Sequence, residues 1–218
     1  MNLINATKSV LRQTPALWVY LWVYQQYQLW EWFRAGKPVP TPHSIKQRVV
    51  KEYARRFHLH VFVETGTYLG EMVNAVKDVF DQIYSIELGV ELYQNAKTRF
   101  AGIRHITIIQ GDSAEVLNEV MAHLNQPCLF WLDSHYSGGI TVKGELETPI
   151  RKEFSHVFGH SIRSRHVILI DDARCFTGEH DYPTIEQLRD MSKSAGFDSF
   201  EVKDDIIRIH KLTPSASN

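Results

Sequence analysis

The chain has 218 residues and carries 24 Lys and Arg against 25 Asp and Glu, which gives a formal net charge of −1. A nearly neutral chain lacks the basic surface that binding to a phosphate backbone requires, so we expect no nucleic-acid partner. Apolar residues make up 44% of the sequence, which is ordinary for one globular domain with an extension.

The first predicted element is an aromatic segment, residues 16–33. Thr14 can cap a helix and Pro15 suits its first position. Gly36 and Pro38 mark an end, so we expect one N-terminal helix. Its continuous apolar run is shorter than the ~20 residues that a membrane span requires.

Three interpretations of this segment remain open. Packing against the domain or against a second subunit, as in a homodimer, is favoured. Peripheral membrane contact is the second, because Trp and Tyr prefer the headgroup zone. A strand is the third, because large aromatic residues alternate at Trp18, Tyr20, Trp22 and Tyr24.

A proline-rich stretch at Pro38, Pro40 and Pro42 predicts a stiff extended linker. A polar helix is expected at about 44–57. We therefore divide the chain into an N-terminal extension with its linker (1–50), an α/β domain (51–212) and a short tail (213–218).

Strand and helix patterns alternate through the domain. Short apolar strands are predicted at 61–64, 83–87, 106–110, 128–133 and 166–171, and helices at 69–80, 89–100, 113–124, 149–158 and 183–195. Such alternation indicates right-handed crossovers and a parallel sheet covered on both faces. Strands at 200–202 and 206–210 flank a turn and predict an antiparallel hairpin. The expected fold is a Rossmann-like, doubly wound, mostly parallel seven-stranded sheet, which binds ligands at the carboxyl ends of its strands.

A glycine turn follows the first strand, at 64–70. Gly66 and Gly70 let the backbone bend sharply and approach a ligand, although the spacing is not that of the dinucleotide GxGxxG motif. Glu87 ends the second strand, where a carboxylate can accept hydrogen bonds from ribose hydroxyls. Asp112 and Ser113 follow the third strand and can contact an adenine or simply cap the next helix. Three such groups at successive strand ends favour a nucleoside ligand.

These motifs resemble those of the class I S-adenosylmethionine-dependent methyltransferases, over about residues 53–211. The resemblance implies that S-adenosylmethionine is the cofactor. The resemblance implies that the glycine turn binds the methionine end of the cofactor, the end of the second strand the ribose, and the end of the third strand the adenine. A further contact is implied after the fourth strand. In chain order, the implied binding residues are Glu64, Gly66, Thr67, Gly70, Glu87, Asp112, Ser113 and Asp133.

Acidic residues also follow the fourth and fifth strands. Asp133, Asp171 and Asp172 could hold one hard cation such as Mg²⁺ through their oxygens, because clustered like charges need a cation or a shared proton. His135 is then a candidate base beside the metal and the acceptor, with Asp133 the second candidate catalytic residue. The alternative is that an aspartate caps a helix or pairs with Arg174, and that His135 is a loop residue.

The acidic strand ends are similar to those of the metal-dependent macrocin O-methyltransferase group. That resemblance implies O-methylation of a sugar or other small-molecule hydroxyl. A glycine-rich loop at 137–148 is a candidate lid, and residues 180–182 are expected at the same rim. His156 and His160 are four residues apart, but a solvated helix face is favoured over a zinc site there.

Two cysteines, Cys128 and Cys175, lack metal-type spacing, and the apolar surroundings of Cys128 favour a buried thiol. With no signal-peptide pattern in the first residues, we expect a cytoplasmic protein. The favoured function is methyl transfer. A metal-assisted hydrolase or an oxidoreductase on the same sheet, and a non-catalytic methyltransferase-like interaction module, are the alternatives, since fold alone does not decide function.

Overall fold

The computed structural model describes residues 15–133 and 149–212, and it divides into two compact units, Met1–Lys46 and Gln47–Asn218. The first unit contains α2 (Pro15–Arg34), whose limits agree with the predicted start at Pro15 and end before Gly36. The strand interpretation of this segment is therefore wrong. Within the described residues, no helix is both long and apolar enough to pass through a bilayer.

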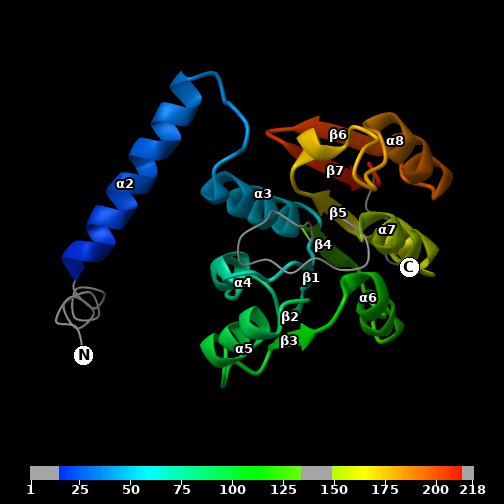
Figure 1. Ribbon diagram of the computed structural model, residues 1–218, viewed down its shortest axis with the longest axis horizontal. Coiled ribbons are helices and arrows are strands. Elements are labelled where there is room, and N and C mark those ends of the chain that lie inside the picture. The colour runs from blue at the N-terminus through cyan, green and yellow to red at the C-terminus, as the bar shows by residue number, and fades with distance from the viewer. Residues whose placement is uncertain (1–14, 134–148, 213–218) are drawn as a thin grey trace. The chain divides into compact units, whose positions relative to one another are not determined.

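The second unit is built on one seven-stranded sheet in the order β3-β2-β1-β4-β5-β7-β6 (Figure 1). Its strands are β1 (Val61–Thr65), β2 (Gln82–Glu87), β3 (Ile106–Gln110), β4 (Cys128–Leu132), β5 (Val167–Ile170), β6 (Ser199–Lys203) and β7 (Ile206–His210). The first five are parallel, and β7 pairs antiparallel with both β5 and β6. The predicted fold class is confirmed.

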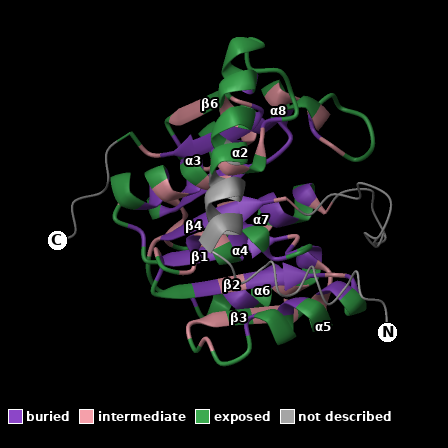
Figure 2. Ribbon diagram, turned by 90° about the vertical axis from the view of Figure 1, so that its left-hand side faces the viewer, coloured by how far each residue is buried: buried purple, intermediate pink, exposed green. Residues whose placement is uncertain are grey.

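Helices cover both faces of this sheet (Figure 1). One face carries α4 (Glu71–Val76), α5 (Val90–Arg99) and the part of α3 (His43–Arg56) that follows Lys46; the other carries α6 (Ser113–Ala122), α7 (Ile150–Gly159) and α8 (Ile185–Ser194). Two 3₁₀ turns, η1 (Arg163–Arg165) and η2 (Ala173–Cys175), flank β5. The central strands are buried along their whole length (Figure 2), as expected for strands covered on both faces.

The helix after β1 is shorter than predicted. Residues 69–80 were expected to be helical, whereas the observed helix α4 covers only Glu71–Val76. Tyr68 and Gly70 adopt left-handed backbone angles, with φ of 49° and 72°, so the helix cannot begin before Glu71. Phe80, at the predicted end, instead lies in the loop and stacks on Phe62 with ring centroids 5.1 Å apart.

Two histidines connect the start of β4 to the segment before β5. The backbone N–H of Cys128 donates to Nδ1 of His166 at 3.1 Å, so His166 carries its proton on Nε2, which donates to Nδ1 of His160 at 2.8 Å. Burial, assisted by the neighbouring His160 and Arg165, lowers the pKa of His166 to about 3. Burial also raises the pKa of Cys128 to about 12, which confirms the predicted buried thiol.

The lowered pKa of His166 predicts sensitivity to acid. The unfolded chain binds a proton at His166 below about pH 6.5, whereas the folded chain excludes it down to about pH 3. The free energy of unfolding should therefore fall as the pH drops below 6.5, by up to about 1.4 kcal/mol per pH unit from this group.

Urea denaturation between pH 7 and pH 5 measures this slope. In His166→Asn, an amide oxygen can still accept from Cys128 but does not titrate, so the slope should decrease although the variant is less stable overall. The matched control is His123→Asn, at an exposed position. Equal slopes in wild type and His166→Asn would contradict the assignment.

Candidate functional site

Backbone hydrogen bonds align the carboxyl ends of the parallel strands. The backbone N–H of Gly66 donates to the carbonyl of Ile86 at 2.9 Å, and the backbone N–H of Gly111 donates to the carbonyl of Glu87 at 3.0 Å. On the other side of β1, the backbone N–H of Asp133 donates to the carbonyl of Thr65 at 3.1 Å. The residues at the carboxyl ends of β1 to β4, including Glu87 as the last residue of β2, therefore lie side by side, and we call this row the strand-end ledge.

The glycine turn occupies the centre of the ledge. Gly66, Tyr68 and Gly70 all have positive φ, of 85°, 49° and 72°, and the N–H of Gly70 donates to the carbonyl of Thr67 at 2.8 Å. A Cβ on Gly70 would come within 2.7 Å of the Phe100 ring. Glycine is thus required at position 70 both by its backbone angle and by the neighbouring ring.

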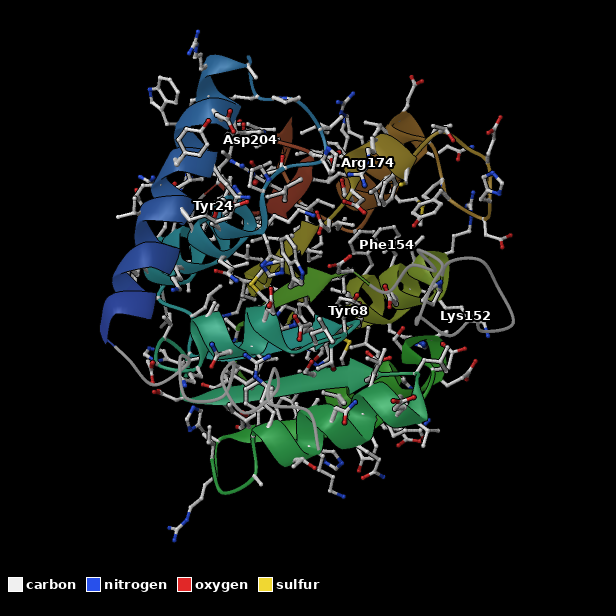
Figure 3. All side chains as sticks on the ribbon, turned by 60° about the vertical axis from the view of Figure 1, so that its left-hand side comes forward. Tyr24, Tyr68, Lys152, Phe154, Arg174 and Asp204 are labelled. Carbon is white, nitrogen blue, oxygen red and sulfur yellow. The ribbon has the colours of Figure 1, made fainter. Side chains whose placement is uncertain are left out.

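The side chain of Glu87 fixes this turn through hydrogen bonds to the backbone. Its Oε2 accepts from the N–H of Tyr68 at 2.7 Å and its Oε1 accepts from the N–H of Gly89 at 2.9 Å (Figure 3 labels Tyr68). Each carboxylate oxygen has a second lone pair, so Glu87 keeps the capacity to accept from a hydroxyl. The structure therefore adds a positioning role to the predicted ribose contact, which stays a prediction.

A buried polar chain lies under the turn. The hydroxyl of Ser85 donates to Oε2 of Glu64 at 2.5 Å, and the hydroxyls of Ser85 and Thr67 are hydrogen-bonded to each other at 2.6 Å. Burial raises the pKa of Glu64 well above its usual range, with the Ser85 hydrogen bond opposing and the charges of Asp133 and Glu87 reinforcing the shift. Ser85 was not among the predicted site residues, although a serine within the predicted apolar strand 83–87 was a signal.

Asp112 caps α6. Its Oδ1 accepts from the N–H of Ala114 at 2.9 Å, so the capping alternative is observed. An adenine contact by Asp112 stays a prediction. The preceding Gly111 has φ of 154°, and a Cβ there would come within 2.4 Å of the Val116 side chain, so a larger residue at position 111 would collide with α6.

The carboxylates of the two aspartates after β5 already have hydrogen-bond and ion-pair partners within the chain. Oδ1 of Asp171 accepts from the N–H of Asp172 at 2.8 Å, and Asp172 forms an ion pair with Arg174 at 2.7 Å (Figure 3 labels Arg174). Arg174 also pairs with Asp205 of the β6–β7 turn. The predicted alternative of an Asp–Arg pair is thus observed. Among residues 15–133 and 149–212, no three His, Cys, Asp or Glu side chains are grouped so that they could hold a metal ion.

The remaining predicted residues have different outcomes. His135 and the candidate lid at 137–148 lie outside the described residues. Residues 180–182 lie against α7, where Arg151 donates to the carbonyls of Asp181 at 3.1 Å and Tyr182 at 3.4 Å. Only His156 of the predicted helical pair lies in α7, where it contacts the carbonyl of Ala114 at 2.7 Å; His160 follows the helix and contacts His166. Both are only half-buried, and neither faces solvent freely.

Comparison with known proteins identifies the fold. No family model and no curated protein matches this chain. Among solved structures, an O-methyltransferase from Bacillus cereus in complex with SAH superposes with a TM-score of 0.56 at 12% identity, covering 85% of this chain and 90% of that one. TomG from Streptomyces achromogenes, an O-methyltransferase of tomaymycin synthesis in complex with SAM, gives 0.54 at 13%, covering 83% and 86%.

A third structure, the SAH-bound methyltransferase PaMTH1 from Podospora anserina, gives a TM-score of 0.52 at 17% identity, covering 86% of this chain and 87% of that one. At these identities the likeness shows a shared fold. The narrower resemblance to the macrocin O-methyltransferase group stays a prediction.

The glycine turn yields a direct test. Gly70→Ala should lower the free energy of unfolding by about 1–3 kcal/mol, because alanine disfavours a positive φ and would meet the Phe100 ring. Gly159→Ala is the matched control, since no atom lies within 4 Å of a Cβ there and its φ is not in the left-handed region. Chemical denaturation of both variants measures the difference; a Gly70→Ala protein as stable as wild type would show that the turn is not built as described.

Proposed function

We propose that this chain is an S-adenosylmethionine-dependent methyltransferase that methylates an oxygen of a small-molecule or sugar hydroxyl. The observation that carries the proposal is the strand-end ledge, where the glycine turn, Glu87 and Gly111–Asp112 follow three neighbouring strands. Solved O-methyltransferases with the same fold, in complex with SAM or SAH, support it.

The chemistry of the ledge residues fits this cofactor. Glu87 has free acceptor capacity for the ribose hydroxyls, and the second carboxylate oxygen of Asp112 can accept from the adenine amino group. The carboxylates of Glu64, Glu87 and Asp133 lie close enough for their charges to interact. The negative charges of Glu87 and Asp133 beside the buried Glu64 favour a ligand that carries both an ammonium and a sulfonium.

The bound cofactor would supply a methyl group already activated as an electrophile. The chain then has to hold the acceptor oxygen in line with that methyl and to exclude water. Removal of the hydroxyl proton is assigned to Asp133 on the ledge and to His135, which follows it in sequence.

Cofactor binding can be tested with a substitution that keeps the fold. In Asp112→Asn the amide oxygen can still cap α6, whereas the second acceptor becomes a donor. Calorimetry should therefore show SAH affinity reduced about tenfold with an unchanged thermal midpoint. Asp78→Asn, on an exposed side chain, is the control and should bind as wild type does.

Two outcomes would contradict the proposal. If neither SAM nor SAH at millimolar concentration gives heat or a thermal shift with the wild-type chain, the cofactor assignment is wrong. If the cofactor binds but no hydroxyl acceptor in a mass-spectrometric screen is methylated, the chain is a non-catalytic methyltransferase-like module.

The described side chains do not support magnesium at Asp133, Asp171 and Asp172, because these three carboxylates are not grouped so that they could hold one cation and Asp172 is paired with Arg174. We therefore expect the thermal midpoint of the wild-type chain to be unchanged by millimolar Mg²⁺ and by a chelator. A midpoint that Mg²⁺ raises and that Asp171→Asn no longer responds to would contradict this expectation, and either result leaves the methyl-transfer proposal intact.

A further inference from the structure

Charge is divided unevenly between the two units. Five of the 24 Lys and Arg but only one of the 25 Asp and Glu lie in Met1–Lys46, so this unit has a formal charge of +4 and Gln47–Asn218 one of −5. The same unit contains four of the chain's five Trp residues, which are Trp18, Trp22, Trp30 and Trp32. A basic, Trp-rich segment thus precedes an acidic domain.

Large apolar side chains of α2 are exposed to solvent. About half of the surface of each of these side chains is accessible: Val23, Tyr24, Tyr27, Trp30 and Phe33 (Figure 3 labels Tyr24). Trp32 is buried instead, and its indole N–H donates to the carbonyl of Pro38 at 2.7 Å, which fixes the turn after the helix. The exposed side chains therefore belong to an ordered end of α2 and not to a frayed one.

Cations lie directly beside the exposed rings. The guanidinium of Arg34 is 5.2 Å from the Trp30 ring, and the ammonium of Lys37 is 5.4 Å from the Phe33 ring. The single acidic side chain of the unit, Glu31, accepts from the Tyr27 hydroxyl at 2.8 Å. Positive charge and aromatic surface are thus combined at the end of α2 and in the turn that follows it.

This combination distinguishes two kinds of partner. Lysine is depleted at protein–protein interfaces, so a second copy would have to bury or displace the ammonium of Lys37 beside the Phe33 ring. The headgroup zone of a bilayer accepts both groups, because Trp and Tyr prefer that depth and anionic lipids attract nearby cations. We propose that the segment from α2 to Lys37 binds the surface of a membrane that contains anionic phospholipids.

Vesicle flotation of the full chain tests this binding. The chain should float with vesicles of phosphatidylcholine and phosphatidylserine, much less with phosphatidylcholine alone, and less at high salt. The double variant Arg34→Gln/Lys37→Gln should lower the partition coefficient about tenfold or more. The matched control, Lys193→Gln/Lys203→Gln, removes the same charge from exposed positions of the acidic domain and should float as wild type does.

A second readout follows the aromatic contact. Trp fluorescence should shift to the blue on adding anionic vesicles, and Trp30→Ala should reduce both the shift and the binding. Circular dichroism shows whether each variant is folded.

Three results would overturn the proposal. These are no flotation with anionic vesicles, flotation that is unchanged by the Arg34→Gln/Lys37→Gln double variant, and a dimer in light scattering that Trp30→Ala dissociates while vesicles are not bound. The last result would assign the exposed surface to a second copy of the chain. SAH binding should be unaffected by these variants, so this test is independent of the proposed function.

Discussion

The carboxylate of Glu87 is the constraint on which the strand-end ledge depends. A buried charge is costly unless hydrogen bonds replace its lost hydration, and here the backbone N–H groups of Tyr68 and Gly89 both point at it. One side chain thereby fixes the glycine turn after β1 and the turn into α5 at the same time. Under the proposed function, this means that the cofactor's ribose would meet a carboxylate that is already oriented.

The carboxyl group of Glu64 is the second buried acidic group at the strand ends, and it is less accessible to solvent than that of Glu87. It is buried on β1, accepts from Ser85 and has a raised pKa, so it carries less charge than an exposed glutamate near neutral pH. An incoming ammonium would lower that pKa again and offset the repulsion from Asp133 and Glu87. Within the proposed function, binding of a cationic cofactor would thus be coupled to release of a proton, and the hydroxyls of Ser85 and Thr67 would keep the carboxylate in place.

The fold was predictable because strand and helix periods alternate clearly, and parallel strands bring successive strand ends to one edge. For the same reason the residues at 66, 87 and 111 could be expected to meet. What could not be predicted depends on contacts between distant segments. Arg174 pairs with Asp205, which is 31 residues away, and no local pattern reveals that register. Likewise, the Phe100 ring that lies against Gly70 comes from the end of α5, so spacing alone could not show that α4 begins only after Gly70.

The opposite charges of the two units decide which of them would contact an anionic membrane under the proposal. An acidic body of formal charge −5 is repelled by an anionic surface, so non-specific adsorption of the whole domain is disfavoured. Only the unit that contains α2 combines net positive charge with exposed rings. Attraction of the first unit and repulsion of the second would then act together, so that binding to an anionic surface takes place through the unit that contains α2.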